Sequence, residues 1–199
     1  MFAPILALLD QLAVSFDLPI LDWIQANLKN GFGDIFWPII TLFGDGGIFW
    51  IGVAVVLLVF PKTRKTGIGM GIALVFGVVV CNITLKPLIG RIRPYDFKEQ
   101  LGVTIPLLGE RLHDYSFPSG HTIASFEASV VIFRNYKKAG IAAIILAFLI
   151  AFSRLYMYYH YPTDVLFSMV VGTIFAIIGD MLAVKVMKLL PRGKYEALQ

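Results

Sequence analysis

The sequence of 199 residues is short of charge and of cysteine, and each shortage excludes a class of protein. Only 15% of the residues are charged and 58% are hydrophobic, whereas soluble domains carry about 25% charged residues. Cys81 is the single cysteine, which excludes an internal disulfide and a multi-cysteine metal site. A single basic face with interleaved aromatic residues is also missing, so no nucleic-acid partner is expected. The composition therefore predicts one polytopic membrane protein rather than a soluble domain.

The sequence contains several long runs of apolar residues. About 20 apolar residues cross a bilayer as a helix, and we expect six spans, some extended by polar flanks, at residues 35–43, 48–60, 67–88, 121–133, 139–157 and 165–190. The first is a short span that turns at the glycines of residues 44–47. The sequence thus predicts an all-α membrane helix bundle, in which glycines 67, 69 and 71 permit close helix packing.

The N-terminal 30 residues are interrupted by acidic side chains, among them Asp10, Asp17 and Asp22. Residues 18–30 have the pattern of an amphipathic helix that lies at the membrane interface. The start lacks a basic region and a cleavage site, so we expect it to be retained. We therefore predict an N-terminal interfacial segment at residues 1–30 and a six-helix membrane domain at residues 31–199.

Basic residues gather in three clusters between the apolar runs, at residues 62–65, 134–138 and 185–194. The positive-inside rule places these clusters and the C-terminus in the cytoplasm. Residues 44–47, 90–118 and 158–163 then lie on the extracytoplasmic side. The last of these turns is rich in tyrosine, which predicts either an interfacial aromatic belt or a wall of the functional site.

Arg154, His160 and Asp164 form the first group with a chemical pattern. If the last span begins at Pro162, a residue suited to a first helical position, Asp164 lies about one turn inside it. A hydrogen bond from one ring nitrogen of His160 to Asp164 would fix the tautomer of the imidazole. The other nitrogen would then be an oriented nucleophile.

Pro118, Ser119, Gly120 and His121 open the fourth predicted span. Amides at a helix N-terminus attract anions, glycine permits close approach of the backbone, and Ser119 adds a hydroxyl donor. His121 is placed where a general acid can protonate a leaving oxygen. Alone, this tetrapeptide is also an ordinary turn before a helix.

Lys86 and Arg93 flank the end of the third span. An arginine offers bidentate recognition of phosphate, and together with Arg154 these side chains make three cations for one phosphate. We interpret Arg91 as a membrane-surface charge. Glu127 and Asp180 fall inside spans; Glu127 is a candidate for lining a substrate cavity, and Asp180 is expected to pair with a lysine of the last basic cluster.

Together these three groups resemble the type 2 phosphatidic acid phosphatase (PAP2) superfamily. Its pattern is Lys-x6-Arg-Pro, then Pro-Ser-Gly-His, then Ser-Arg-x5-His-x3-Asp. All three elements occur here in order and without a gap, between residues 86 and 164. The motifs leave the first 30 residues outside the resemblance.

The resemblance implies a catalytic mechanism. His160 attacks phosphorus and forms a phosphohistidine, Asp164 supports His160, and His121 protonates the leaving oxygen. The phosphoryl oxygens are held by a set of five residues: Lys86, Arg93, Ser119, Gly120 and Arg154. No cofactor and no metal are implied.

The predicted function is that of an integral membrane lipid phosphatase with its site on the extracytoplasmic face. Its partners are a phosphorylated lipid and the membrane lipids; the oligomeric state stays open. Undecaprenyl pyrophosphate, phosphatidylglycerol phosphate and phosphatidate are the candidate substrates, and the first leads by family analogy. Two alternatives remain: a lipid phosphotransferase that uses the same phosphohistidine, and a transporter or scramblase that only binds the headgroup.

Overall fold

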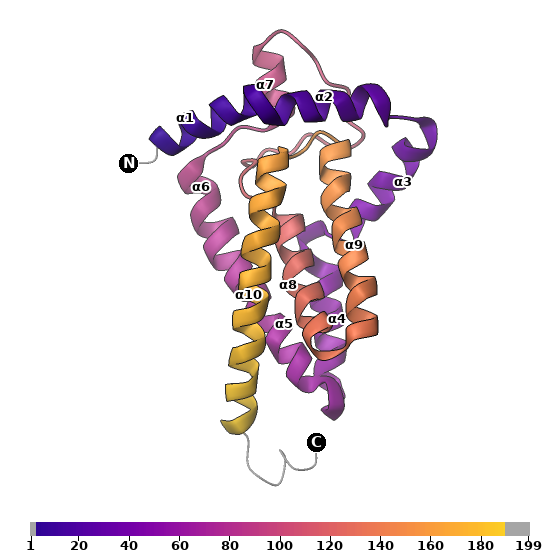
Figure 1. The fold of residues 1–199 in the computed structure, drawn as a ribbon, viewed down its shortest axis with the longest axis vertical. Helices are drawn as coiled ribbons and strands as arrows, with labels where there is room; N and C mark the ends of the chain where they lie inside the picture. Colours follow the sequence, from indigo (N-terminus) through magenta and orange to yellow (C-terminus); the bar gives the residue numbers. More distant parts are fainter. Residues whose placement is uncertain (1–2, 190–199) are drawn as a thin grey trace.

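A computed structural model describes residues 3–189 of the chain, and this part is helical (Figure 1). Its α-helices are α1 (Ala3–Leu12), α2 (Leu18–Asn27), α3 (Gly31–Leu42), α4 (Ile48–Val59), α5 (Arg64–Phe76), α6 (Lys86–Ile89), α7 (Pro94–Gln100), α8 (Gly120–Asn135), α9 (Lys137–Tyr156) and α10 (Pro162–Leu189). Two π-helical segments, η1 (Ala13–Asp17) and η4 (Gly77–Leu85), join α1 to α2 and α5 to α6. Short 3₁₀ turns, η2 (Asp45–Gly47) and η3 (Pro61–Thr63), precede α4 and α5.

The bundle is built around α8, which packs against α9, α10 and α5 (Figure 1). These helices have little polar contrast around their circumference, because in a membrane both the lipid-facing and the protein-facing sides are apolar. α8 begins at Gly120 and α10 at Pro162, as the sequence predicts. The all-α membrane bundle is therefore confirmed.

The first predicted span takes a different form in the structure. Within residues 3–189, five helical runs are long and apolar enough to cross a membrane, and Gly31–Val59 is one of them. α3 and α4 therefore form one run with a kink, where Gly46 and Gly47 take positive φ angles of 56° and 67°. The prediction of a short span that reverses at these glycines is wrong, and six spans are not confirmed. A glycine pair at positive φ suits a kink as well as a reversal.

The N-terminal helix, formed by α1, η1 and α2, lies across one end of the bundle instead of running along it (Figure 1). Its length and composition would also allow a span. Its inner face, with Leu21 and Ile24, packs on the turn between α9 and α10. This arrangement is the one expected of an interfacial helix; the division at residue 30 stays a prediction.

Four tyrosines of the α9–α10 turn are buried beneath the N-terminal helix. Their exposed fractions are 1% to 3%, for Tyr156, Tyr158, Tyr159 and Tyr161. The hydroxyls of Tyr156, Tyr158 and Tyr159 form hydrogen bonds inside the protein; that of Tyr158, for example, donates to Asp22 at 2.7 Å. The alternative of an exposed aromatic belt is therefore wrong, because the N-terminal helix covers this turn.

Asp180 links three helices at the end of the bundle away from the N-terminal helix. Its carboxylate accepts from Arg134 at 2.8 Å and Asn135 at 2.9 Å, and lies 3.2 Å from Lys65. The predicted pairing with the last basic cluster is wrong, since the partners come from the two other clusters. The contact shows that residues 65 and 134 lie at the same end, as their common charge predicts.

Glycines allow α5 to approach both α10 and α4 closely. A Cβ atom on Gly179 would lie 2.5 Å from the Gly69 carbonyl oxygen, and one on Gly67 would lie 2.8 Å from the Ala54 carbonyl oxygen. The expected packing role is thus confirmed for Gly67 and Gly69. A Cβ atom on Gly71 would have no neighbour within 4 Å, so the expectation fails there.

We predict that Gly179→Val lowers the thermal stability in detergent, because backbone atoms of α5 cannot move aside; overpacking of this kind costs about 1–3 kcal/mol. Gly71→Val is the matched control and is expected to leave the melting temperature within a degree or two of the wild type. Equal melting temperatures for the two variants would contradict the packing role of Gly179.

Candidate active site

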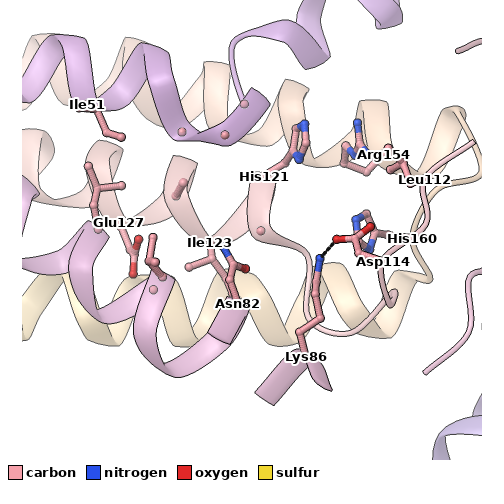
Figure 2. Close-up of a pocket in the computed structure, with 18 of the residues that line it drawn as sticks. Ile51, Asn82, Lys86, Leu112, Asp114, His121, Ile123, Glu127, Arg154 and His160 are labelled. Carbon is pink, nitrogen blue, oxygen red and sulfur yellow. Dashed lines mark hydrogen bonds and ion pairs between the residues drawn. The ribbon is translucent and has the colours of Figure 1, made fainter. Parts of the chain in front are cut away.

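A cavity of about 460 Å³ lies where the N-terminal end of α8 meets η2, η4 and the α9–α10 turn (Figure 2). Six of the eight predicted site residues line it: Lys86, Arg93, Gly120, His121, Arg154 and His160. Ser119 and Asp164 are fully buried behind its wall. The three motifs, which are up to 78 positions apart in the chain, therefore converge on one cavity.

Lys86 and Arg93 meet on one carboxylate, that of Asp114. Lys86 forms an ion pair with this carboxylate, and Arg93 donates to it at 2.5 Å. Burial raises the pKa of Asp114, but hydrogen bonds and charges from Lys86 and Arg93 outweigh burial and hold this pKa well below its usual range. Asp114 therefore stays ionised and forms ion pairs with two of the cations that the sequence predicts to bind phosphate.

Arg154 supplies the third cation from the end of α9. One terminal nitrogen donates to the Thr41 hydroxyl at 2.6 Å, and the guanidinium lies 4.6 Å from the centre of the Tyr159 ring. Its Nε atom has no hydrogen-bond partner although the residue is 2% exposed. Arg154 thus keeps unused donor capacity beside the cavity, and the Tyr159 ring packs against its guanidinium.

His160 is 2% exposed and lies beside Arg93, whose terminal nitrogen is 3.4 Å from Nε2 of the imidazole. Burial, then the positive charges of Arg93 and Arg154, lower the pKa of His160 well below its usual value. The imidazole is therefore neutral at physiological pH and has a lone pair available on one nitrogen.

Asp164 reaches the other face of His160 indirectly. Its Oδ2 is 3.7 Å from Nδ1 of His160, which is longer than a hydrogen bond. Ser116 lies between them: its hydroxyl donates to Asp164 at 2.5 Å and is 3.5 Å from Nδ1. The expected direct hydrogen bond is not formed. Nδ1 is nevertheless the ring nitrogen on the side of Asp164 and Ser116, so Nε2 is the nitrogen that faces the cavity.

His121 projects into the cavity from the first turn of α8 (Figure 2). Its Nε2 lies 2.6 Å from Asp45 of η2. The glycine turn closes over the ring, because a Cβ atom on Gly44 would lie 2.6 Å from the His121 ring. Asp45 and Gly44 therefore fix the orientation of the predicted general acid.

Ser119 and Gly120 take different positions. The Ser119 amide donates to Ser168 at 2.9 Å, and its hydroxyl accepts from Thr122 at 3.0 Å. Gly120 lies at the cavity wall beside Asn82. The helix N-terminus therefore presents Gly120 to the cavity, whereas Ser119 supports it from behind; their roles toward phosphate stay predictions.

Arg91 is fully buried, so its interpretation as a membrane-surface charge is wrong. Its guanidinium forms ion pairs with Asp17 and with Asp164, and it stacks on Tyr161 at 3.7 Å. The N-terminal helix supplies Asp17 and covers the arginine. The sequence at residues 89–93 has charged residues beside apolar ones, and this local pattern does not predict that another helix buries Arg91.

Glu127 lines the deep end of the cavity, as expected (Figure 2). It lies six positions after His121, about 9 Å along the helix axis. The residue is 1% exposed and its Oε1 has no hydrogen-bond partner. The cavity thus has a polar point within walls that are mostly apolar there, such as Leu74 and Ile123.

Sequence reasoning missed several residues that contact the motifs, among them Asp45, Asp114 and Ser116. The only available signal was their position, since Asp114 and Ser116 lie just before the Pro-Ser-Gly-His motif and Asp45 lies between glycines. Among residues 3–189, no group of three or more His, Cys, Asp or Glu side chains is placed to hold a metal ion.

The fold and the cavity define a multi-pass membrane protein with a cationic, histidine-bearing site at one end of its bundle. Residues 66–186 match the PAP2 superfamily, and the chain belongs to that superfamily. Every motif residue from Lys86 to Asp164 falls within the matched stretch, whereas Asp17 and Asp45 lie before it.

Known relatives agree with this assignment. The undecaprenyl-diphosphatase of Sulfolobus acidocaldarius is 35% identical over 125 residues, which cover 62% of this chain and 58% of that protein. Phosphatidylglycerophosphatase B of Bacillus subtilis is 32% identical over 167 residues, 77% of this chain and 71% of that protein. The crystal structure of Aquifex aeolicus LpxE has a TM-score of 0.73 at 26% identity, over 83% of this chain and 94% of that one.

We predict that Asp114→Asn strengthens the binding of inorganic phosphate, because the carboxylate competes with phosphate for Lys86 and Arg93. The Asp114 side chain is 53% exposed, so solvent weakens its ion pairs and the gain is about three- to tenfold in the inhibition constant. Asp96→Asn removes a half-buried partner of Arg111 outside the cavity and is the matched control. Weaker inhibition by phosphate in Asp114→Asn would contradict this role.

Proposed function

We propose that this chain is a metal-independent lipid phosphatase that acts through a phosphohistidine on the extracytoplasmic face of the membrane. The observation that carries the proposal is the position of His160: a neutral, buried imidazole whose Nε2 lies 3.4 Å from Arg93 at the wall of a cavity lined by two further cations. A neutral nucleophile beside cations suits attack on an anionic phosphate.

In the first step, the lone pair of His160 Nε2 attacks phosphorus, and the bond from phosphorus to the lipid oxygen breaks. His121 donates its proton to that oxygen, which leaves as the lipid alcohol or lipid phosphate. Lys86, Arg93 and Arg154 stabilise the negative charge on the three equatorial oxygens. The proton on Nδ1 is held toward Ser116 and Asp164, which stabilise the positive phosphohistidine.

In the second step, water attacks the phosphohistidine. His121, now deprotonated, accepts a proton from this water, and the bond between phosphorus and Nε2 breaks. Inorganic phosphate is released and both histidines return to their starting states. His121 thus acts as acid and then as base, and the Asp45 carboxylate at 2.6 Å favours the protonated form that the first step requires.

The apolar surroundings support a lipid as the substrate. A second hollow of about 360 Å³, between α4 and the α5–η4 helix, has apolar walls that include Val55, Leu58 and Val75. It shares Ile51, Leu74 and Val78 with the catalytic cavity. A hydrocarbon chain attached to the phosphate would leave the cavity by this route, with burial contributing about 0.8 kcal/mol for each CH₂ group.

The basic clusters support the proposed orientation. Lys65 and Arg134 lie with Asp180 at the end of the bundle opposite the cavity. Since short basic loops stay in the cytoplasm, the cavity faces the other side. In this orientation the substrate is supplied in the outer leaflet, and phosphate is released outside.

The headgroup is tested by a panel of lipids. Undecaprenyl pyrophosphate leads among the candidates because the Sulfolobus acidocaldarius relative is named for it, and phosphatidylglycerol phosphate follows because of the Bacillus subtilis relative. Phosphatidate is the third. Phosphate release by purified protein in detergent, with and without a lipid alcohol as acceptor, separates hydrolysis from phosphotransfer. No release and no transfer with any of them would overturn the proposed function.

We predict that His160→Ala lowers phosphate release by about 10³-fold or more, because the nucleophile is lost. With a lipid labelled in its terminal phosphate, wild-type protein quenched in denaturant carries a base-stable, acid-labile label, and the variant carries none. His113→Ala, in the exposed part of the loop before Asp114, is the control and keeps full activity. Wild-type turnover by His160→Ala would remove His160 from the mechanism.

We further predict that a chelator in excess leaves the activity of the purified protein within about twofold of the untreated rate, since three cationic side chains supply the charge stabilisation. The measurement is phosphate release before and after EDTA, followed by Mg²⁺ addition. Strict dependence on added Mg²⁺ would contradict the metal-independent scheme.

A further inference from the structure

The N-terminal helix reaches the catalytic residues through one buried side chain, Asp17. This residue ends the π-helical segment η1 and is 0% exposed. It lies outside the stretch that matches the family, which begins at residue 66. A fully buried carboxylate in a helix at the membrane interface is costly unless its partners compensate it, so its contacts need a functional or structural reason.

Every contact of Asp17 leads toward Asp164. Arg91 donates to Asp17 Oδ2 at 2.8 Å, and through its other terminal nitrogen it pairs with Asp164. Thr163, the residue before Asp164, donates to Asp17 from its amide at 2.9 Å and from its hydroxyl at 2.7 Å. Asp17 therefore fixes both the arginine that touches Asp164 and the start of α10 that carries it.

The π-helical segment explains how the helix delivers this carboxylate. A π segment inserts an extra residue into a turn and shifts the following side chains around the helix axis, and such segments are frequent at functional sites. Here η1 lies between α1 and α2, and both Ala13 and Asp17 face inward and are buried. The flanking helix keeps its apolar face on the bundle through Leu18 and Leu21.

Charge gives the arrangement its consequence. If Arg91 paired with Asp164 alone, the positive guanidinium would neutralise the negative charge of this carboxylate. Asp17 pairs with the same guanidinium, so the two carboxylates and one arginine together carry one net negative charge beside His160. A phosphohistidine is positively charged on its ring, and a net negative group near Nδ1 stabilises it.

We propose that Asp17 is a positioning residue of the active site: through Arg91 it orients Asp164 and preserves the negative charge that supports His160, which makes the N-terminal helix part of the catalytic unit. This inference rests on the proposed phosphohistidine mechanism. Asp17 itself touches no substrate; its effect is carried by Arg91 and Thr163.

The test compares Asp17→Asn with Asp22→Asn in the full-length protein. Asp22 also anchors the N-terminal helix, since it accepts from Lys98 at 2.6 Å and from Tyr158 at 2.7 Å, but it has no link to Asp164. We expect Asp17→Asn to lower kcat about 10- to 100-fold, as for groups that orient metal-binding side chains, with KM within about twofold. Asp22→Asn is expected to keep the wild-type kcat. Equal kcat values for Asp17→Asn and wild type would overturn the inference.

A double-mutant cycle separates positioning from a merely structural role. If Asp17 acts through Asp164, Asp17→Asn has no further effect on kcat in an Asp164→Asn background. If it only stabilises the fold, its effect is the same in both backgrounds, and the inference is wrong. The residual activity of the Asp164→Asn protein is followed as the rate of phosphoenzyme labelling in a single turnover.

A second variant covers the case in which Asp17→Asn does not fold. Arg91→Lys keeps the charge, but a lysine lacks the planar fork that bridges two carboxylates. It is expected to lower kcat to a similar extent, and full activity in Arg91→Lys would overturn the inference. An inactive wild-type protein would instead refute the proposed function, so the two failures are distinguishable.

Discussion

Like charges gathered in an apolar setting are the constraint on which this structure depends. Lys86, Arg93 and Arg154 line one cavity at the end of a membrane bundle, and their mutual repulsion has to be compensated. Asp114 supplies the main compensation, and Asp45 faces His121. Both acids come from connecting segments, whereas Lys86 and Arg154 lie on helices and Arg93 lies directly before α7.

The same constraint accounts for the second layer of the site. Asp164 is fully buried, and its charge is tolerated because Arg91, Ser116 and the Tyr161 amide bind it. Arg91 in turn is buried beneath the N-terminal helix, whose Asp17 pairs with it. The helix that crosses the end of the bundle is therefore required by the electrostatics beneath it, and its apolar contacts with the tyrosine cluster give it a fixed position.

The sequence predicts those parts of the site that depend on fixed spacing. The motifs, the helix starts at Gly120 and Pro162, and the meeting of the three cations all follow from it. Contacts made by connecting segments do not, since the partner of Asp114 or Ser116 is decided by loop geometry. Burial of Arg91 and of the tyrosines was missed for a related reason: a covering helix leaves no trace in the local pattern of the segment that it covers.

The kink between α3 and α4 shows a different limit. Two adjacent glycines permit positive φ, and the sequence cannot distinguish a kink from a reversal at such a pair. The outcome matters for the site, because the kink, unlike a reversal, brings Gly44 onto the ring of His121. The position of the predicted general acid thus depends on the backbone of a segment that carries no motif.

Asp114 also sets an entry threshold for anions. A small, water-soluble phosphate can displace this carboxylate only through its charge. Much of the resulting attraction is cancelled by the free energy needed to remove water from the phosphate. An amphiphile adds the free energy of its hydrocarbon tail, which enters the apolar hollow at the same time. In the proposed reaction, this acidic side chain thereby favours ligands that arrive from the bilayer over those that arrive from the aqueous phase, and it competes with the phosphate product for Lys86 and Arg93.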